Sequence, residues 1–247
     1  MNSIDFLKRG FSAFELKVLA CVFMLIDHIG YILLPQFEIL RVIGRLAFPL
    51  FAYFIAEGCR YTKNKLKRFL SVFVLGILCE LAYIVFSGNG AGNVLLTFSV
   101  SILLIYLLSY TKKMFVKNVA LGFVSLLLFA LSLVIAYFCC GYLGLDYGFF
   151  GAMLPVLVVA FDDMGKWSDK LYKKIDRKIV SLSMFSLGLL CVDFFEVSMQ
   201  CQIYSLLSVI LLALYNGERG KYSLKYGFYL FYPVHLFVLQ VIANLVE

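Results

Sequence analysis

The stretch "MLIDHIGYILLPQFEILRVIGRLAF", Met24–Phe48, places four ionisable side chains inside two apolar runs. Asp27 and His28 interrupt the first run, and Arg41 and Arg45 interrupt the second. The link "PQFE" between the runs is short, so we expect the two runs to form a tight helical hairpin. A charge inside hydrocarbon costs at least ~2.5 kcal/mol, and such side chains usually face a partner or a wet cavity.

The rest of the chain is as apolar as this hairpin. Of its 247 residues, 63% are hydrophobic and only 15% are charged, and the mean hydropathy is +0.94. A soluble domain carries about 25% charged residues. We therefore expect an all-α, polytopic membrane helix bundle formed by one domain, residues 1–247. The first apolar run, Ala13–Leu34, carries Asp27 and His28 and lacks a cleavage site, so it is assigned as a span rather than as a signal peptide.

Apolar runs divide the chain into about nine transmembrane spans. A spanning helix needs about 20 residues, so the sixth and eighth runs are short, and whether they cross fully stays open. The predicted spans are Ala13–Leu34, Ile39–Gly58, Phe69–Phe86, Val94–Tyr110, Val119–Cys139, Tyr147–Phe161, Ile179–Phe195, Ile203–Tyr215 and Gly227–Val246. The longest polar stretch, Asp162–Lys178, is expected to be a loop, with an interfacial helical turn near Trp167–Tyr172.

The distribution of Lys and Arg predicts the orientation. With a cytoplasmic N-terminus, every basic residue except Arg41 and Arg45 lies in the N-terminal segment, the first helical turns or a cytoplasmic loop. One such loop is the fourth-to-fifth, with Lys112, Lys113 and Lys117. The net charge of +7 is then a topology signal and an attraction to anionic lipid heads. We therefore expect no nucleic-acid partner.

The hairpin brings its four ionisable groups to one depth. Asp27 and His28 lie ~9–10 Å from the hairpin end by helical rise, and Arg45 lies at a comparable depth on the return. Arg41 and Arg45 share one helix face, so Asp27 is expected to pair with one of them. Adjacent helical residues point ~100° apart, which leaves His28 free of Asp27 as a neutral general base. The alternative is an Asp–Arg clamp with His28 as a buried polar packer.

Other ionisable residues fall at membrane depth. His235 in "YPVHLF" follows Pro233, which is expected to kink or widen the helix, and it is either catalytic or a polar packer. Glu57 lies at the cytoplasmic end of the second span, where it is either solvated or functional. Glu80 is expected to be buried and partnered, whereas Asp193 lies near the outer surface.

Five blocks of the sequence resemble one known family. The blocks are "LKVLACVFMLIDHIGYIL", "LRVIGRLAFPLFAYFIAEGCRYT", "NVLLTFSVSILLIYL", "LDYGFFGAML" and "YLFYPVHLFVL". Together, from Leu16 to Leu239, they resemble the TraX family, named for the F-pilin acetylation protein and similar to other multi-span membrane acyltransferases. The resemblance implies transfer of an acetyl group from acetyl-CoA to an amine or hydroxyl of a small molecule, glycan or peptide. It also implies the plasma (inner) membrane of a bacterium.

The resemblance assigns roles to the ionisable residues. Asp27, His28, Arg41, Arg45 and His235 fall on motif positions and are the expected catalytic residues. His28 would take a proton from the acceptor or carry the acyl group itself, and an arginine would stabilise the thioester oxygen. The acceptor would enter from the outer side or laterally from the lipid.

The expected binding site for the acyl donor is a basic inner rim. Its residues would contact the phosphates of acetyl-CoA, although each lysine is equally well explained as a topology signal. The rim consists of Arg60, Lys63, Lys65, Lys67 and Arg68, and Glu57 at the end of the second span is also expected to take part in binding the donor.

Two readings from other classes stay open. Buried Asp, Glu, His and Arg also suit a proton-coupled transporter or flippase, although no inverted repeat is visible. A non-catalytic assembly subunit has little need of so many intramembrane charges. No metal is predicted, because the seven cysteines form no ligand-spaced set with a histidine.

Overall fold

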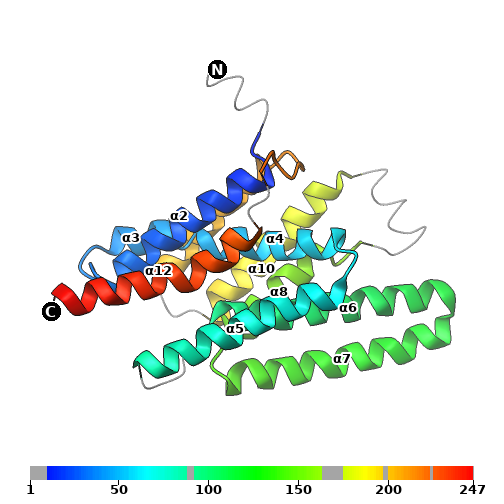
Figure 1. Ribbon diagram of the computed structural model, residues 1–247. Coiled ribbons are helices and arrows are strands. Elements are labelled where there is room, and N and C mark those ends of the chain that lie inside the picture. Colours follow the sequence, from blue (N-terminus) through cyan, green and yellow to red (C-terminus); the bar gives the residue numbers. More distant parts are fainter. Residues whose placement is uncertain (1–9, 88–91, 163–174, 197–199, 223–224, 247) are drawn as a thin grey trace. The chain divides into compact units, whose positions relative to one another are not determined.

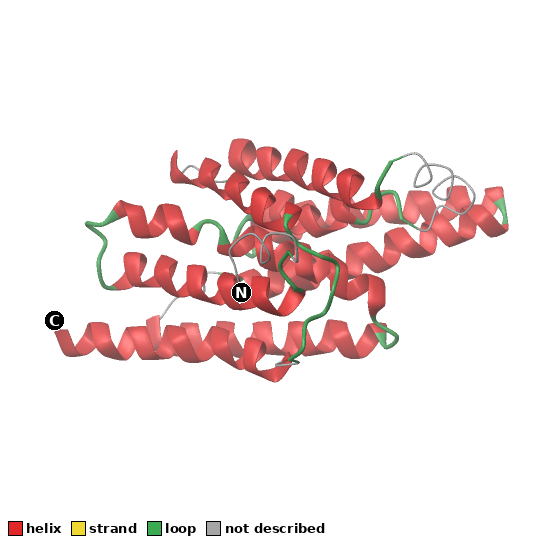
Figure 2. Cartoon of the chain, turned by 90° about the horizontal axis from the view of Figure 1, so that it is seen from above, coloured by secondary structure: helices red, strands yellow, loops and turns green. Residues whose placement is uncertain are grey.

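The computed structural model describes residues 10–87, 92–162, 175–196, 200–222 and 225–246 (Figure 1). Within these ranges the chain is helix and loop, which confirms the all-α class (Figure 2). The loop residues predicted to form an interfacial turn lie outside them. The chain divides into two compact units, residues 1–54 with 198–247, and residues 55–197.

Long apolar helices account for most of the predicted spans. Among the described residues, five helical segments are long and apolar enough to cross a membrane: Glu38–Tyr61, which contains a turn at residues 45 and 46, Lys65–Val85, Val94–Lys117, Val119–Tyr142 and Arg177–Phe195. Large apolar side chains on them are exposed, such as Leu127, at 71%. A surface of this kind suits hydrocarbon rather than water. The protein is therefore an integral membrane helix bundle.

The first unit contains the hairpin and the last helix. Helix α2, Ala13–Ile32, begins with a capping box in which Ser12 and Glu15 bond reciprocally, and α3, Glu38–Gly44, returns along it. Helix α12, Lys225–Val246, lies beside α2 and runs in the same direction (Figure 1). The first and last of nine spans must run in the same direction, so this pairing agrees with the predicted order of spans.

Backbone bonds fix the start of α2 against the end of the predicted eighth span. The N–H of Phe11 donates to the carbonyl of Leu214 at 2.8 Å, and the N–H of Asn216 donates to the carbonyl of Phe11 at 2.9 Å. The N-terminal end of α2 and the loop before α12 therefore lie at the same end of this unit. The positive-inside pattern assigns both to the cytoplasmic side.

The predicted second span is not one continuous helix. Helix α3 ends at Gly44, residues 45 and 46 form a turn, and α4 covers Ala47–Tyr61. Pro49 has no N–H to donate to the carbonyl of Arg45, which breaks the hydrogen-bond ladder at this place. Arg45 consequently lies in the turn between α3 and α4 rather than inside a continuous helix.

The two short predicted spans differ from ordinary transmembrane helices. Helix α8, Gly148–Val158, has 11 residues and is ~16 Å long, about half the hydrocarbon thickness. It cannot cross as a straight helix. The eighth span begins as a 3-10 helix, η1, Gln200–Leu207, and continues as α11, Ser208–Ala213. Its ~25 Å length approaches the hydrocarbon thickness, because the 3-10 form rises farther per residue.

The second unit is built from the remaining helices. They are α5 (Lys65–Ser87), α6 (Val94–Lys117), α7 (Val119–Tyr142), α8 and α10 (Arg177–Phe195). Asn118 alone joins α6 to α7: its N–H donates to the carbonyl of Met114, and its side chain accepts from the N–H groups of Ala120 and Leu121. The fourth-to-fifth loop expected around Lys112 is therefore helix up to this residue. Glu80 is partnered, since it accepts from the N–H of Gly92 at 3.0 Å.

Candidate active site

Asp27 on α2 is bound by both arginines of the hairpin. Nη1 of Arg41 donates to Oδ2 of Asp27 at 2.5 Å, and Nη2 of Arg45 donates to Oδ1 at 3.0 Å and to Oδ2 at 3.2 Å. The close approach depends on Gly44, because a Cβ there would lie 2.6 Å from the Cα of Asp27 and overlap its side chain. The predicted pairing is present, with both arginines rather than one. We call Asp27, Arg41 and Arg45 the arginine clamp.

The two arginines of the clamp differ in exposure. Arg45 is buried, and its Nη1 donates to Oε1 of Gln202 on η1 at 3.3 Å. The side chain of Arg41 is 17% exposed, and its guanidinium lies 5.0 Å from the ring centroid of Tyr31. No described residue accepts a hydrogen bond from Nε or Nη2 of Arg41. Arg41 can therefore donate to a further group, whereas Arg45 fastens the clamp to η1.

His28 points away from the clamp, toward α12. Its Nδ1 lies 3.1 Å from Nε2 of His235, and the ring centroids are 4.9 Å apart. Adjacent helical residues project ~100° apart, so Asp27 reaches α3 while His28 reaches α12. We call His28 and His235 the histidine pair.

The hydrogen bonds of the histidine pair assign its protons. Nδ1 of His28 lies 2.9 Å from the carbonyl of Met24, and Nδ1 of His235 lies 2.7 Å from the carbonyl of Phe231. A carbonyl only accepts, so each neutral ring carries its proton on Nδ1. Nε2 of His235 then accepts from Nδ1 of His28. Nε2 of His28 keeps a lone pair that no described residue engages, and its ring is only partly buried.

The inner member of the pair is packed among aromatic rings. His235 is buried, stacks on Phe231 at 4.7 Å between centroids and meets Tyr232 edge-on. Helix α12 continues through Pro233 without interruption, so the expected wide turn does not form. His235 is thus a fixed support behind the more accessible His28.

A row of buried polar side chains on the eighth span was not predicted. Gln202, Ser205 and Ser208 recur every three residues, and side chains at this spacing share a face where the chain is 3-10 helix. Nε2 of Gln202 and the two hydroxyls are buried, with no hydrogen-bond partner among the described residues. Polar residues at a spacing of three within an apolar run are the signal that sequence reading could have used. Gln202, the first residue of the row, accepts a hydrogen bond from Arg45, so the row adjoins the arginine clamp.

In the second unit, Arg60 lies at the centre of a separate cluster. Its Nε donates to Asp162 at 2.7 Å, its Nη1 is bound to Glu57, and its Nη2 donates to the carbonyl of Val158 and to Ser181. Its side chain is only 8% exposed. Arg60 therefore joins the end of α8 to α4 and α10 instead of extending from an open rim.

Two other cations complete this cluster. Nη2 of Arg177 lies 2.9 Å from the carboxylate of Asp162. Burial acts to raise the pKa of Asp162, but hydrogen bonds and charge from Arg177 and Arg60 hold that pKa below its ordinary value. Nζ of the buried Lys112 donates to the carbonyl of Val159 at 2.7 Å. Cations thus satisfy the terminal carbonyls of α8, as at other helix C-termini.

Lys63 lies on the turn from α4 to α5, whereas Lys65, Lys67 and Arg68 lie in the first turn of α5. Lys63 and Lys67 are exposed, while Arg68 is half-buried and donates to the carbonyl of Ile55 at 3.1 Å. Gly58 allows this approach, because a Cβ there would overlap the guanidinium of Arg68. A contact between the five rim residues and an acyl donor stays a prediction.

The sequence also matches a family as a whole. The family model described as TraX protein matches residues 12–243. The chain belongs to the TraX family. The match includes the arginine clamp, the histidine pair and the Arg60 cluster of this TraX-family chain.

Two relatives are similar to this TraX-family chain. One is the "Probable fimbrial assembly protein FimC, serogroup H1" of Dichelobacter nodosus, 26% identical over 93% of this chain and 94% of that protein. The other is an uncharacterized protein of Rickettsia prowazekii (strain Madrid E), 38% identical over 27% of this chain and 25% of that protein. No solved structure matches.

Proposed function

We propose that this TraX-family protein is an acetyltransferase of the bacterial inner membrane, which moves an acetyl group from acetyl-CoA to an amine or hydroxyl acceptor. One observation carries the proposal: no described residue engages the lone pair on Nε2 of His28, while its Nδ1 is held by the carbonyl of Met24 and by His235. A base needs this arrangement, with one ring nitrogen available and the other fixed.

In the proposed reaction His28 first accepts a proton and later returns it. Nε2 of His28 takes the proton from the acceptor's amine or hydroxyl, whose heteroatom attacks the carbonyl carbon of the thioester. A carbon–heteroatom bond forms and the carbon–sulfur bond breaks. The CoA thiolate takes the proton back from Nε2 and leaves as the thiol. No other reactant is consumed.

Neighbouring groups stabilise the charges that develop in this step. The imidazolium formed at His28 donates from Nδ1 to the lone pair of His235 and to the carbonyl of Met24. Arg41 has donors left after binding Asp27 and is the proposed partner of the thioester oxygen. Arg45 and Asp27 keep this arginine in place, which makes Arg45 a positioning residue.

The donor's phosphates require exposed cations. Lys63 on the turn from α4 to α5 and Lys67 in the first turn of α5 are exposed and are the proposed phosphate contacts, with Arg68 beside them. Glu57 and Arg60 contribute by holding the end of α4 in the Arg60 cluster.

The acceptor's biological setting is suggested by one relative. The protein of Dichelobacter nodosus is named as a fimbrial assembly protein, and the similarity covers nearly the whole chain. We propose that the acceptor here also belongs to the assembly of a surface fibre or of its envelope surroundings.

Transfer of radiolabelled acetyl groups by the purified protein in detergent tests the proposal. The wild type should transfer acetyl groups to amines or hydroxyls, and His28→Gln should not. Gln240→Leu is the matched control, because Gln240 is an exposed polar residue on α12. Activity in His28→Gln equal to that of the wild type would overturn the mechanism.

The histidine pair also supports a second candidate function. Two hydrogen-bonded imidazoles at membrane depth can relay a proton, as in proton-coupled transporters. Absence of acetyl transfer, together with proton-driven uptake in vesicles, would favour this function.

A further inference from the structure

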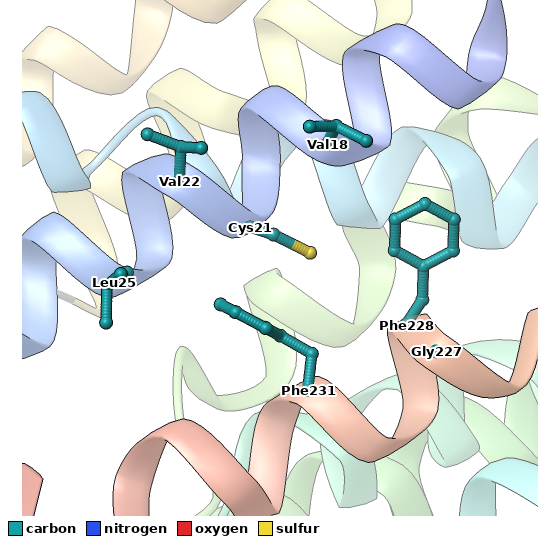
Figure 3. A pocket seen from close by; sticks show the side chains of 7 residues that line it. All are labelled: Val18, Cys21, Val22, Leu25, Gly227, Phe228 and Phe231. Carbon is teal, nitrogen blue, oxygen red and sulfur yellow. The ribbon is translucent and has the colours of Figure 1, made fainter. Parts of the chain in front are cut away.

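An apolar groove runs between α2 and α12, within the first unit (Figure 3). Its volume is about 350 Å³, at the lower end of the ~300–1,000 Å³ of small-molecule sites. Val18, Cys21, Val22 and Leu25 line it from α2, and Phe228 and Phe231 line it from α12. Val18 and Val22 are 39% and 45% exposed, so the groove opens toward the surrounding lipid.

The groove leads toward the histidine pair. On α2 the spacing from Cys21 to Leu25 to His28 is four and three residues, which keeps all three on one helix face. On α12 the corresponding residue is Phe231, which lines the groove and stacks on His235. A chain lying in the groove therefore ends beside His28.

The direction of the groove selects the leaflet. Measured back from Leu33, the C-cap of α2, His28 lies ~7 Å deep and Cys21 ~18 Å deep. With a hydrocarbon core of ~30 Å, Cys21 lies near the bilayer centre and His28 in the outer half. A lipid of the outer leaflet has the same orientation as the groove, because its head lies at the outer surface and its chain is directed to the bilayer centre.

The size of the groove selects a single hydrocarbon chain. One turn of an α-helix, with a diameter of ~10–12 Å and a pitch of 5.4 Å, occupies more than ~400 Å³. The groove is smaller than this single turn, so the side chains of a peptide helix could enter it but the helix itself could not. An extended alkyl chain is narrower and gains free energy along its whole length by contact with the apolar lining.

We propose that this groove holds the hydrocarbon chain of the acceptor, an outer-leaflet amphiphile whose head bears the reacting amine or hydroxyl. The inference rests on the proposed acetyl transfer and names its substrate class. The acceptor enters sideways from the bilayer, and its chain fixes the head beside Nε2 of His28.

Two measurements on the full-length protein in detergent test this inference. The first measures acetyl transfer to n-alkylamines of increasing chain length, at constant mole fraction in the micelle. KM, expressed as mole fraction in the micelle, should fall with each added methylene until the groove is filled and stay constant beyond that length, because packing against the apolar lining replaces looser contacts with detergent. The second uses an alkylamine with a diazirine at its chain end, and mass spectrometry should locate the label on α2 and α12 near Cys21.

Groove variants provide the control. Val22→Trp should block the groove, remove the chain-length dependence and prevent labelling near Cys21. Leu127→Trp makes a similar change on an exposed apolar position of α7 and should leave both readouts as in the wild type.

The outcomes separate this inference from the proposed function. Acetyl transfer that is independent of acceptor length, with label spread over the lipid-facing surface, overturns the inference and leaves the transferase. The inference is also overturned if KM depends on the acyl-chain length of the CoA donor instead of the acceptor, or if only helical peptides are acetylated. Labelling near Cys21 without any transfer overturns the acceptor's identity and the transferase together.

Discussion

His28 and His235 lie 207 positions apart in the sequence, and their Nδ1 and Nε2 atoms are 3.1 Å apart in the fold. The contact joins the first span to the last. It gives the two histidines different roles, because Nε2 of His28 has no hydrogen-bond partner in the described part of the chain, whereas His235 is buried and its Nε2 accepts from His28.

Substitutions of His28 and of His235 should lower kcat by unequal amounts. His28→Gln should lower kcat by about 10²–10⁴-fold, since it removes the base. His235→Leu should reduce kcat less, and His235→Gln least, because an amide oxygen can still accept from Nδ1 of His28. Steady-state kinetics of the three variants check this order. Greater loss in His235→Gln than in His28→Gln would exchange the two roles.

Arg45 should matter for stability more than Arg41. Arg45→Met removes the arginine whose Nη2 bonds both oxygens of a largely buried carboxylate, a change that costs ~3–5 kcal/mol for buried pairs. Arg41→Met should lower kcat with a smaller loss of Tm, because Arg41 is more exposed. Thermal unfolding in detergent measures both. The double variant Arg45→Met with Asp27→Asn should recover part of the lost Tm, and no recovery would argue against the clamp.

Gly44→Ala should loosen the hairpin. A Cβ at this position overlaps Asp27, and overpacking of this kind costs ~1–3 kcal/mol. Gly141→Ala on α7 is the matched control, because a Cβ there meets nothing within 4 Å. Tm should fall in the first variant only. An equal effect in both would mean that helix propensity, rather than contact with Asp27, decides the outcome.

Arg60→Ala should lower Tm, whereas Lys63→Ala should raise the KM for acetyl-CoA. Arg60 is enclosed by Glu57 and Asp162, while Lys63 is exposed. A KM effect without a loss of Tm in Arg60→Ala would restore Arg60 to the phosphate site.

The same cluster predicts an acid response. The pKa of Asp162 is lowered in the fold, so its contribution is complete above its ordinary pKa and is lost as pH falls toward the lowered value. Asp162→Asn should therefore lower Tm at pH 7 and weaken the decline of Tm in acid. An unchanged acid profile in this variant would assign the decline to other carboxylates.

Cysteine labelling should confirm the orientation. Phe37, exposed in the hairpin turn, belongs to the outer side by the positive-inside pattern, and Lys63 belongs to the cytoplasmic side. In a variant without native cysteines, Phe37→Cys should react with an impermeant maleimide on intact cells. Lys63→Cys should react only after permeabilisation, and the reverse result would invert the topology.

The membrane class, most of the spans and the hairpin with its ion pair could be predicted from the amino-acid sequence. These features follow from local patterns: apolar length, the placement of Lys and Arg, and a short link between two runs. The link forces Asp27 to face the return segment within a few turns, so no distant contact is needed to predict the pairing.

Contacts between groups that are distant in the sequence depend on how the helices pack. His235 reaches His28 because α12 packs parallel to α2, and Gln202 reaches Arg45 because η1 packs on α3. Arg60 became a buried centre rather than a rim residue because Val158 on α8, Asp162 in the turn after it and Ser181 on α10 surround it. Helical periodicity predicts which face of a helix a residue occupies. Which helix packs against that face depends on the tertiary structure, and helices with apolar surfaces in lipid carry few sequence signals for their packing partners.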